Sequence, residues 1–346
     1  MEKVIKTGLL AYGMSGKVFH APFLEAHPGF RLSAVTERHH KNAASAYPDI
    51  KSYDTIDDLL NDEDLDLVVV NTPNFSHYDY TKSALLKGKH VLVEKPFTAT
   101  VAEAKELFEL ARTVGKQVFV YQNRRYDSGF NSVKNIMDQG VLGKLNEVHF
   151  RYDRYRPTIG PKTFKEEIMP ATGMQYDLGP HLLDQAIALF GKPLRFYKVL
   201  GKNRKDTKVD DFFSIHLSYP NSVNVYVTGN MLVTDIQPAF VLHGETGSYI
   251  KNHADVQEDQ LLKGMKPSDN TFGIEESGQE GKLTLIDEEG NKTQRQVPAE
   301  KGRYIDLFDA VYQSLTNGTA YPVKEEQVLC QLEILEAEDG VIVSNK

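Results

Sequence analysis

The chain has 346 residues, of which 40% are hydrophobic and 25% are charged, and this length and composition suit about two globular domains. Its net charge of −8 comes without a basic block that could follow a phosphate backbone, so no nucleic-acid partner is expected. Cys330 is the single cysteine, which excludes an intrachain disulfide and a cysteine-based zinc site, and no metal is expected. No apolar stretch is long enough to cross a bilayer and no signal-peptide pattern opens the chain, so a cytoplasmic protein without a membrane partner is expected.

Short apolar runs alternate with helical patterns in the first third of the chain. Strands are predicted at 4–11, 32–36, 67–71, 90–93 and 117–121, with helices between them at 18–26, 56–61, 78–86 and 101–114. The run Leu67–Asn71 is apolar almost throughout, as expected for a parallel strand that is covered on both faces. Thr100 and Glu103 match the capping box that opens a helix. This alternation predicts an α/β domain with a doubly wound parallel sheet over residues 1–123.

The pattern changes after residue 124. Helices are predicted at 130–139, 181–190, 304–315 and 325–337, and strands at 212–219, 223–228, 240–243, 283–286 and 294–297. Pro220–Ser222 has the composition of a hairpin turn between two of these strands. We therefore predict a second domain, over residues 124–346, with a mainly antiparallel sheet and helices on one face. Strands 212–219 and 223–228 carry Phe, Ile, Leu, Val and Tyr side chains, and a face left open by the helices would need a partner.

The first predicted strand runs into Ala11-Tyr12-Gly13-Met14-Ser15-Gly16, and a helical pattern follows. This is the G-x-G-x-x-G fingerprint of dinucleotide binding with alanine in place of the first glycine. Gly13 would let the backbone approach a pyrophosphate, and Gly16 would let the helix pack close to the strand. Ala11 weakens the match because the first glycine makes the tight turn, so a plain glycine turn is the alternative.

The residues after the second strand bear on the choice of cofactor. Glu37 lies about 20 residues beyond the glycine loop, where an acid binds the ribose 2′-hydroxyl of NAD. Arg38 follows it and would suit the 2′-phosphate of NADP. The residues therefore predict NADP or NAD as the cofactor and leave both open.

Two segments offer acid–base chemistry. Lys95 follows the strand 90–93 at the carboxyl edge where open α/β sheets bind ligands, although a solvated surface lysine is the common alternative. Asp177 and His181 are four residues apart and would share a face if one helix carried both. Pro180 favours a helix that begins near Gly179, with Asp177 just before it. A structural His–Asp pair explains the spacing equally well.

Four segments together match a known family in order and spacing: Asn71-Thr72-Pro73 with His77, Glu94-Lys95-Pro96, Asn123–Asp127 and Asp177–His181. On these residues the chain resembles the glucose–fructose oxidoreductase / inositol dehydrogenase (Gfo/Idh/MocA) family nearly from end to end. The resemblance implies a Rossmann domain followed by an α+β domain with a large open sheet. In this family the open sheet often forms a dimer or tetramer interface.

The resemblance also implies roles for individual residues. The implied catalytic residues are Lys95, Asp177 and His181. The implied cofactor contacts are Tyr12, Gly13, Met14, Gly16, Glu37, Arg38, Thr72, Pro73, His77, Glu94, Lys95 and Asn123. The implied substrate contacts are Lys95, Arg124, Tyr152, Arg154, Asp177 and His181.

Two further segments concern the substrate. Tyr152–Pro157 resembles a branch that includes NADP-dependent scyllo-inositol dehydrogenases, although an ordinary strand would also explain its alternation. Phe164-Lys165 stands where many members have a tryptophan-containing segment, and this chain has no tryptophan. We expect an oxidoreductase that transfers a hydride between a nicotinamide dinucleotide and a ring hydroxyl or ketone of a polyol or sugar. A cofactor-binding regulator without turnover and an NAD-dependent glycoside-cleaving enzyme are the alternatives.

Overall fold

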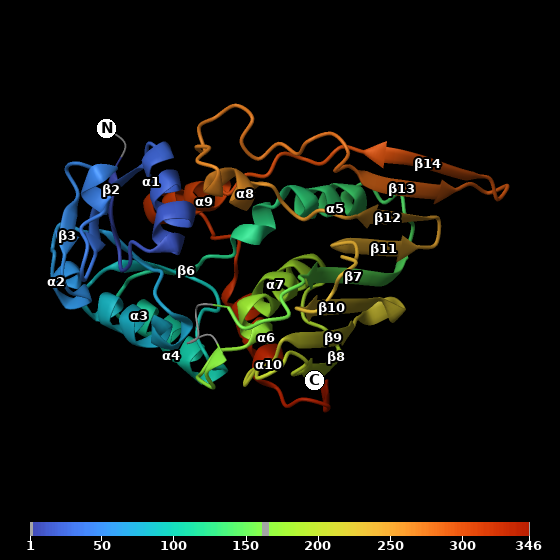
Figure 1. Cartoon of the computed structure of the whole chain (residues 1–346), viewed down its shortest axis with the longest axis horizontal. Helices are drawn as coiled ribbons and strands as arrows, with labels where there is room; N and C mark the ends of the chain where they lie inside the picture. The colour runs from blue at the N-terminus through green and yellow to red at the C-terminus, as the bar shows by residue number, and fades with distance from the viewer. Residues whose placement is uncertain (1–2, 161–165, 346) are drawn as a thin grey trace. The chain divides into compact units, whose positions relative to one another are not determined.

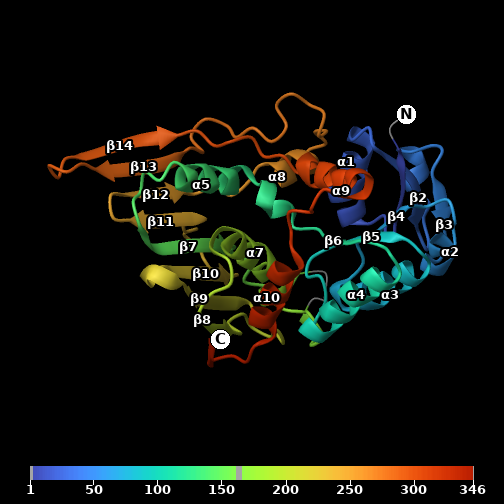
Figure 2. The same ribbon diagram turned by 180° about the vertical axis from the view of Figure 1, so that it is seen from behind.

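The structure is a computed structural model that describes residues 3–160 and 166–345 (Figures 1 and 2). Phe164 and Lys165 lie outside the described residues. The chain forms two compact units, the first from residues 1–123, 257–272 and 303–329, and the second from residues 124–256, 273–302 and 330–346. The first unit thus combines the N-terminal 123 residues with two later segments, and the division into 1–123 and 124–346 stays a prediction.

A six-stranded parallel sheet forms the centre of the first unit. Its strands are β1 (Ile5–Leu9), β2 (Phe30–Thr36), β3 (Lys51–Tyr53), β4 (Leu67–Val70), β5 (His90–Val93) and β6 (Val118–Val120). Their order is β3-β2-β1-β4-β5-β6, which confirms the predicted doubly wound sheet. The strand order reverses between β1 and β4, and ligands of such sheets bind at the carboxyl ends beside this reversal.

The helices of the first unit begin and end near their predicted bounds except in two places, 257–262, where no helix is predicted, and 18–26. They are α1 (Ala21–Ala26), α2 (Ile56–Leu60), α3 (His77–Leu86), α4 (Val101–Thr113), α8 (Gln257–Leu262) and α9 (Ile305–Asn317). The capping box of Thr100 and Glu103 opens α4 as predicted. No helix in the described ranges is both long and apolar enough to cross a membrane.

The predicted single helix over 18–26 is wrong. A π-helical turn covers Gly16–His20, and α1 begins only at Ala21. The amide of Ala21 bonds to the carbonyl of Gly16, five residues back. Pro22 explains the change, because proline has no amide hydrogen and its ring clashes with the carbonyl four residues earlier.

A nine-stranded sheet forms the second unit. Its strands are β7 (Leu145–Asp153), β8 (Arg195–Gly201), β9 (Phe212–Ser218), β10 (Asn224–Asn230), β11 (Phe240–Gly244), β12 (Gly247–Lys251), β13 (Gly281–Ile286), β14 (Lys292–Val297) and β15 (Ile342–Ser344). The order is β14-β13-β12-β11-β7-β10-β9-β8-β15, and only the β7–β10 pair is parallel. The predicted mainly antiparallel sheet is confirmed, including the hairpins β9–β10 and β13–β14.

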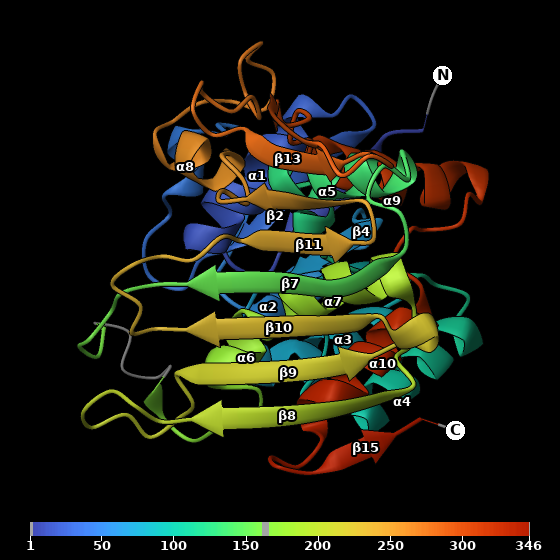
Figure 3. The same ribbon diagram turned by 90° about the vertical axis from the view of Figure 1, so that its right-hand side faces the viewer.

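Helices cover one face of this sheet. Figure 3 shows the other face of the sheet towards the viewer, with α5 (Ser128–Asp138), α6 (Met174–Asp177) and α7 (Gly179–Phe190) behind it. The last helix, α10 (Glu325–Glu336), begins in a segment of the first unit and ends in a segment of the second. One covered face and one open face agree with the prediction from the sequence.

The aliphatic side chains of β9 and β10 lie on the face that the helices cover, so the condition under which they would need a partner is not met. Phe213, Ile215 and Val227 are fully buried, and the ring of Phe213 reaches close to Gly179 at the start of α7. The alternate positions, including His216 and Tyr226, lie on the open face and are half-buried. The aliphatic side chains of β9 and β10 are therefore buried by helices of the same chain.

Candidate active site

The glycine loop after β1 is held by a side chain from the end of β4. Asn71 Oδ1 accepts a hydrogen bond from the amide of Ala11 at 3.0 Å, and its Nδ2 donates to the Ala11 carbonyl at 2.7 Å. Ala11 is not among the residues with positive φ. The turn that a first glycine usually makes is therefore fixed here by Asn71, which explains why alanine is tolerated.

The two glycines of the motif differ in their surroundings. A Cβ atom at Gly16 would lie 2.4 Å from the carbonyl oxygen of Ala11, so the loop itself requires glycine there. A Cβ atom at Gly13 would meet nothing within 4 Å. Gly13 therefore leaves open space beside the backbone, as a loop that receives a pyrophosphate must.

The two residues that follow β2 are a buried glutamate, Glu37, and an exposed arginine, Arg38. Glu37 is 7% exposed, and its carboxylate accepts hydrogen bonds from the amide of Asn42 at 2.7 Å and the hydroxyl of Ser52 at 2.9 Å. The amide of Ala43 donates to the same carboxylate. Arg38 is exposed. A ribose hydroxyl would compete with three existing donors for the Glu37 carboxylate. The Arg38 side chain, in contrast, is accessible to a ligand.

His77 joins the turns that follow β4 and β5. Its Nδ1 lies 2.7 Å from the carbonyl oxygen of Pro96, and its Nε2 lies 2.9 Å from that of Thr72. The ring is fully buried, and this burial lowers the pKa of His77 although both carbonyls favour the charged form. His77 therefore links the turn after β4 to the turn after β5. Its ring is buried and bonded to Thr72 and Pro96, so the predicted contact of His77 with the cofactor stays a prediction.

The carboxylate of Glu94 accepts hydrogen bonds from the glycine loop, from the π-helical turn and from the turn after β5. Ser15 Oγ and His20 Nε2 both lie 2.9 Å from Glu94 Oε1, and the amide of Lys95 donates to Oε2 at 3.3 Å. Burial alone would raise the pKa of Glu94, but the hydrogen bonds from His20 and Ser15 and the charge of Lys95 lower it below its usual value. The glycine loop and the turn that carries Lys95 are thus tied to one ionised group. The following Lys95–Pro96 peptide bond is cis.

The other predicted cofactor contacts are placed around these loops. Met14 is 52% exposed, and the ring of Tyr12 packs edge-on against Tyr47 at a centroid distance of 6.4 Å. Pro73 precedes the 3-10 turn Asn74–Ser76, and Asn123 is buried after β6.

Four of the predicted substrate contacts lie together in the second unit. The guanidinium of Arg154 is 4.9 Å from the centroid of the Tyr152 ring, and that of Arg124 is 5.4 Å from it. Arg154 also lies 3.9 Å from Asp177 Oδ2. The group combines a ring face with guanidinium donors and a carboxylate, which can accept hydrogen bonds or hold a proton.

Buried contacts fix this group to α7. Arg125 forms a bidentate pair with Asp184 of α7, with both N–O distances at 2.7 Å. Gln185, the next residue, donates to the carbonyl of Arg124 at 2.9 Å. Arg124 is therefore held by the same helix that carries His181.

Asp177 and His181 lie on two consecutive helices, as the position of Pro180 suggests. Asp177 ends α6, Leu178 lies between, and α7 begins at Gly179. His181 is 6% exposed, and the side chain of Asp177 is 31% exposed. A carboxylate and an imidazole in this segment can hold and exchange a proton.

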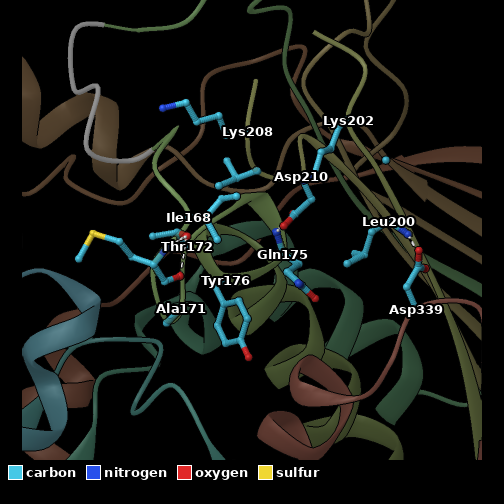
Figure 4. A pocket seen from close by; sticks show the side chains of 13 residues that line it. Ile168, Ala171, Thr172, Gln175, Tyr176, Leu200, Lys202, Lys208, Asp210 and Asp339 are labelled. Carbon is cyan, nitrogen blue, oxygen red and sulfur yellow. Dashed lines mark hydrogen bonds between the residues drawn. The ribbon is translucent and has the colours of Figure 1, made fainter. Parts of the chain in front are cut away.

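Asp210 fixes the start of α6, and the sequence pattern gives no sign of it. Its carbonyl accepts from the amide of Met174 at 2.9 Å, and its Oδ2 accepts from the amide of Gln175 at 2.6 Å. Figure 4 shows Asp210 beside Gln175 in a hollow of about 420 Å³. Gly173 has a φ of 90°, and a Cβ atom there would lie 2.0 Å from Asp210 Oδ1. Burial raises the pKa of Asp210 to about 6.

Three supporting residues are missing from the predicted site: His20, Asp210 and, as a support of the loop, Asn71. The position of Asn71 at the end of a buried strand is a signal that could have found it. Pro22, two residues after His20, indicates an irregular helix but not its partner. Asp210 lies 35 residues from Gln175, and no local pattern links the two.

Two family models match the chain. One, described as an oxidoreductase family with an NAD-binding Rossmann fold, covers residues 5–122. The other, described as a GFO/IDH/MocA C-terminal domain, covers residues 130–250. The N-terminal match confirms an NAD(P)-binding Rossmann domain.

Relatives and solved structures match over nearly the whole chain. The scyllo-inositol 2-dehydrogenase (NADP(+)) IolW of Bacillus subtilis is 34% identical over 96% of this chain and 92% of its own length. The oxidoreductase C115.03 of Schizosaccharomyces pombe is 39% identical over 96% of both chains. The solved structure of the oxidoreductase yvaA from Bacillus subtilis has a TM-score of 0.96 and 32% identity, covering 100% of this chain and 99% of the other.

The space beside Gly13 leads to a test of the cofactor site. We expect Gly13→Val to abolish dinucleotide binding, because the added side chain would occupy the space that the pyrophosphate needs. The fold should stay intact, because a Cβ atom at Gly13 meets no protein atom within 4 Å. Fluorescence titration with NADPH and NADH measures binding, and thermal unfolding measures the fold. Gly16→Ala is the contrasting variant, since its Cβ clashes with the loop itself and should lower stability. Unchanged affinity in Gly13→Val would place the dinucleotide elsewhere.

The raised pKa of Asp210 predicts a pH dependence of stability. A buried acid whose folded pKa is about 6, against an ordinary value of 3.8, costs stability as it ionises, so this cost grows as the pH rises from about 4 to 6. Asp210→Asn lacks this ionisation, so its free energy of unfolding should improve relative to wild type by roughly 2 kcal/mol between pH 4 and pH 7. Urea unfolding of both proteins across this range measures the difference. A difference that does not change with pH would contradict the assignment.

Proposed function

Because the chain belongs to the glucose–fructose oxidoreductase / inositol dehydrogenase (Gfo/Idh/MocA) family of oxidoreductases, we propose that it transfers a hydride between NADP and a ring hydroxyl or ketone of a polyol or sugar. The group of Arg124, Tyr152, Arg154 and Asp177 is the observation that carries the substrate class. Vicinal hydroxyls both donate and accept, so a carboxylate beside a guanidinium matches them, and the Tyr152 ring holds the two guanidinium groups in place. The relative IolW, a scyllo-inositol 2-dehydrogenase, supports this class.

Each candidate catalytic residue has a role in this proposal. A bound nicotinamide supplies or accepts the hydride. His181 exchanges the proton of the reacting hydroxyl, since an imidazole is an effective acid and base near neutral pH. Lys95 stabilises the negative charge that develops on the substrate oxygen. Asp177 accepts hydrogen bonds from the substrate or orients His181.

The preference for NADP rests on the residues after β2. The Glu37 carboxylate is already bonded to Asn42, Ala43 and Ser52 and is buried, so it is poorly placed to accept from a ribose diol. Arg38 is exposed beside it and carries the positive charge that a 2′-phosphate requires. In this interpretation Glu37 stabilises the loop after β2 and Arg38 binds the 2′-phosphate.

The catalytic assignment is tested with a panel of cyclic polyols and aldoses, read by absorbance of the reduced nicotinamide. We expect His181→Ala and Lys95→Ala to lower kcat by about 10²–10⁴-fold, the usual cost of losing an acid–base group, while cofactor affinity changes little. Lys192→Ala, which removes an exposed lysine paired with Glu333, is the control and should retain activity. Turnover is normalised to folded protein. Near-normal turnover of both alanine variants would end the assignment, and a wild type inactive on the whole panel would favour a regulator.

The cofactor preference is tested by comparing kcat/KM for NADP and NAD. Wild type should favour NADP, and Arg38→Ala should reduce kcat/KM for NADP by at least about tenfold, roughly 1.4 kcal/mol, with little effect for NAD. His40→Ala, a neighbouring exposed position, serves as the control. Equal efficiency of the wild type with both cofactors would contradict the preference.

We also propose that the open face of the nine-stranded sheet associates with a second copy of the chain. His149, Tyr226 and His216 lie on the adjacent strands β7, β10 and β9 and form a stack of three rings, with centroid distances of 4.9 and 4.7 Å. Such a flat aromatic surface is typical of the centre of an interface. We expect a dimer or tetramer in sedimentation at micromolar concentration, and Tyr226→Glu should dissociate it. A wild-type monomer under these conditions would refute the proposal.

A further inference from the structure

His20 is a buried polar residue that neither the sequence motifs nor the proposed chemistry uses. It ends the π-helical turn Gly16–His20, is fully buried, and packs its ring against Tyr121 at a centroid distance of 4.5 Å. Its Nε2 lies 2.9 Å from Glu94 Oε1, although the two residues are 74 positions apart in the chain. A fully buried imidazole directed at a partly buried carboxylate needs a reason, because an aliphatic side chain would fill the place of the imidazole without a desolvation cost.

The surroundings of His20 show which of its ring nitrogens donates to Glu94. Glu94 also accepts from Ser15 Oγ and from the amide of Lys95, so its carboxylate acts as the acceptor and Nε2 must carry the proton. Nδ1 is buried and has no hydrogen-bond partner among the described residues. His20 is therefore the donor in its contact with Glu94.

The π-helical turn gives His20 its direction. The wider turn places the amide of Ala21 on the carbonyl of Gly16 and ends at His20, whose φ of −121° departs from the helical value. Pro22 prevents a continuous α-helix here. On the other side, Tyr121 at the end of β6 donates its hydroxyl hydrogen to the carbonyl of Phe19 at 2.8 Å. The ring of His20 is thus fixed by the turn before it and by a neighbouring strand end.

We propose that His20 is a positioning residue for Lys95: by donating to Glu94 it holds the carboxylate against Ser15 and fixes the turn after β5 from which Lys95 extends. The inference rests on the proposed function, in which Lys95 stabilises charge on the substrate. Glu94 Oε2 receives the amide of Lys95 itself, so a displaced carboxylate displaces the lysine backbone. An error of about 1 Å in such a group can cost on the order of 10²-fold in rate.

Variants that keep or remove the donor test this role. His20→Leu removes it, whereas the amide Nε2 of His20→Gln can still reach Glu94. We expect kcat to fall about 10–100-fold in His20→Leu, with the Kd for NADPH changed by less than about threefold, and His20→Gln to recover most of the loss. Hydrogen exchange of the segment 94–97, measured by mass spectrometry on the protein alone, should be faster in the leucine variant and restored in the glutamine variant.

His27 offers a matched control. It is a second buried histidine, at the other end of α1, and its Nε2 lies 3.4 Å from Asp309 Oδ1. It lies near the amino ends of β1 and β2, where Ile5 bonds to Gly29, and away from the carboxyl edge that carries Lys95. His27→Leu should therefore lower the unfolding temperature but leave kcat per folded molecule and exchange at 94–97 unchanged.

The outcomes separate this inference from the proposed function. Equal exchange at 94–97 in wild type and His20→Leu, or equal losses in the leucine and glutamine variants, would overturn the positioning role. If wild type transfers no hydride to any substrate of the panel, the proposed function fails, and the exchange experiment still decides whether His20 orders the turn. Should His20→Leu not fold, His20→Asn replaces it, because its shorter side chain cannot reach Glu94.

Discussion

The partly buried carboxylate of Glu94 is the constraint on which the geometry of the first unit depends. An ionised carboxylate with little access to water must be met by several donors, and here Ser15, His20 and the amide of Lys95 provide them. These donors come from the glycine loop, the π-helical turn and the turn after β5. Loops that would otherwise vary independently are thereby fixed to one another, and Asn71 and His77 add two similar links.

The second unit follows the same principle with different groups. Asp210 holds the start of α6, and the bidentate pair of Arg125 and Asp184 holds the 3-10 turn of Arg124 against α7. Asp177 and His181 are thus placed by buried polar contacts behind them, which restrict the positions that the two short helices can take. A group that must hold or move a proton benefits from such fixed surroundings, because less reorganisation is needed during the reaction.

Local patterns were enough to predict the elements that depend on local chemistry. The apolar run of β4, the capping box of α4 and the turn residues of the β9–β10 hairpin each carry their own signal, and the two sheets follow from the order of such signals. The strands β3 and β15 carry little signal because each is a three-residue strand at a sheet edge without a buried apolar residue, whereas the equally short β6 has buried Phe119 and Val120. Alternation along β9 and β10 shows which side chains share a face, but not which face the helices cover. The burial of the Glu37 side chain and the contact of His20 with Glu94 depend on residues that are not adjacent in sequence. The motifs therefore predict the candidate site residues but not the residues that hold them in position.

Transfer of a deuterium label tests the central claim most directly. A polyol deuterated at the reacting carbon is incubated with the protein and NADP, and the nicotinamide product is analysed by mass spectrometry. Direct hydride transfer between a ring carbon and the nicotinamide predicts that the deuterium appears on the nicotinamide ring with one label per turnover. Reduced nicotinamide that carries no deuterium, or oxidised substrate formed without any reduced nicotinamide, would contradict the account.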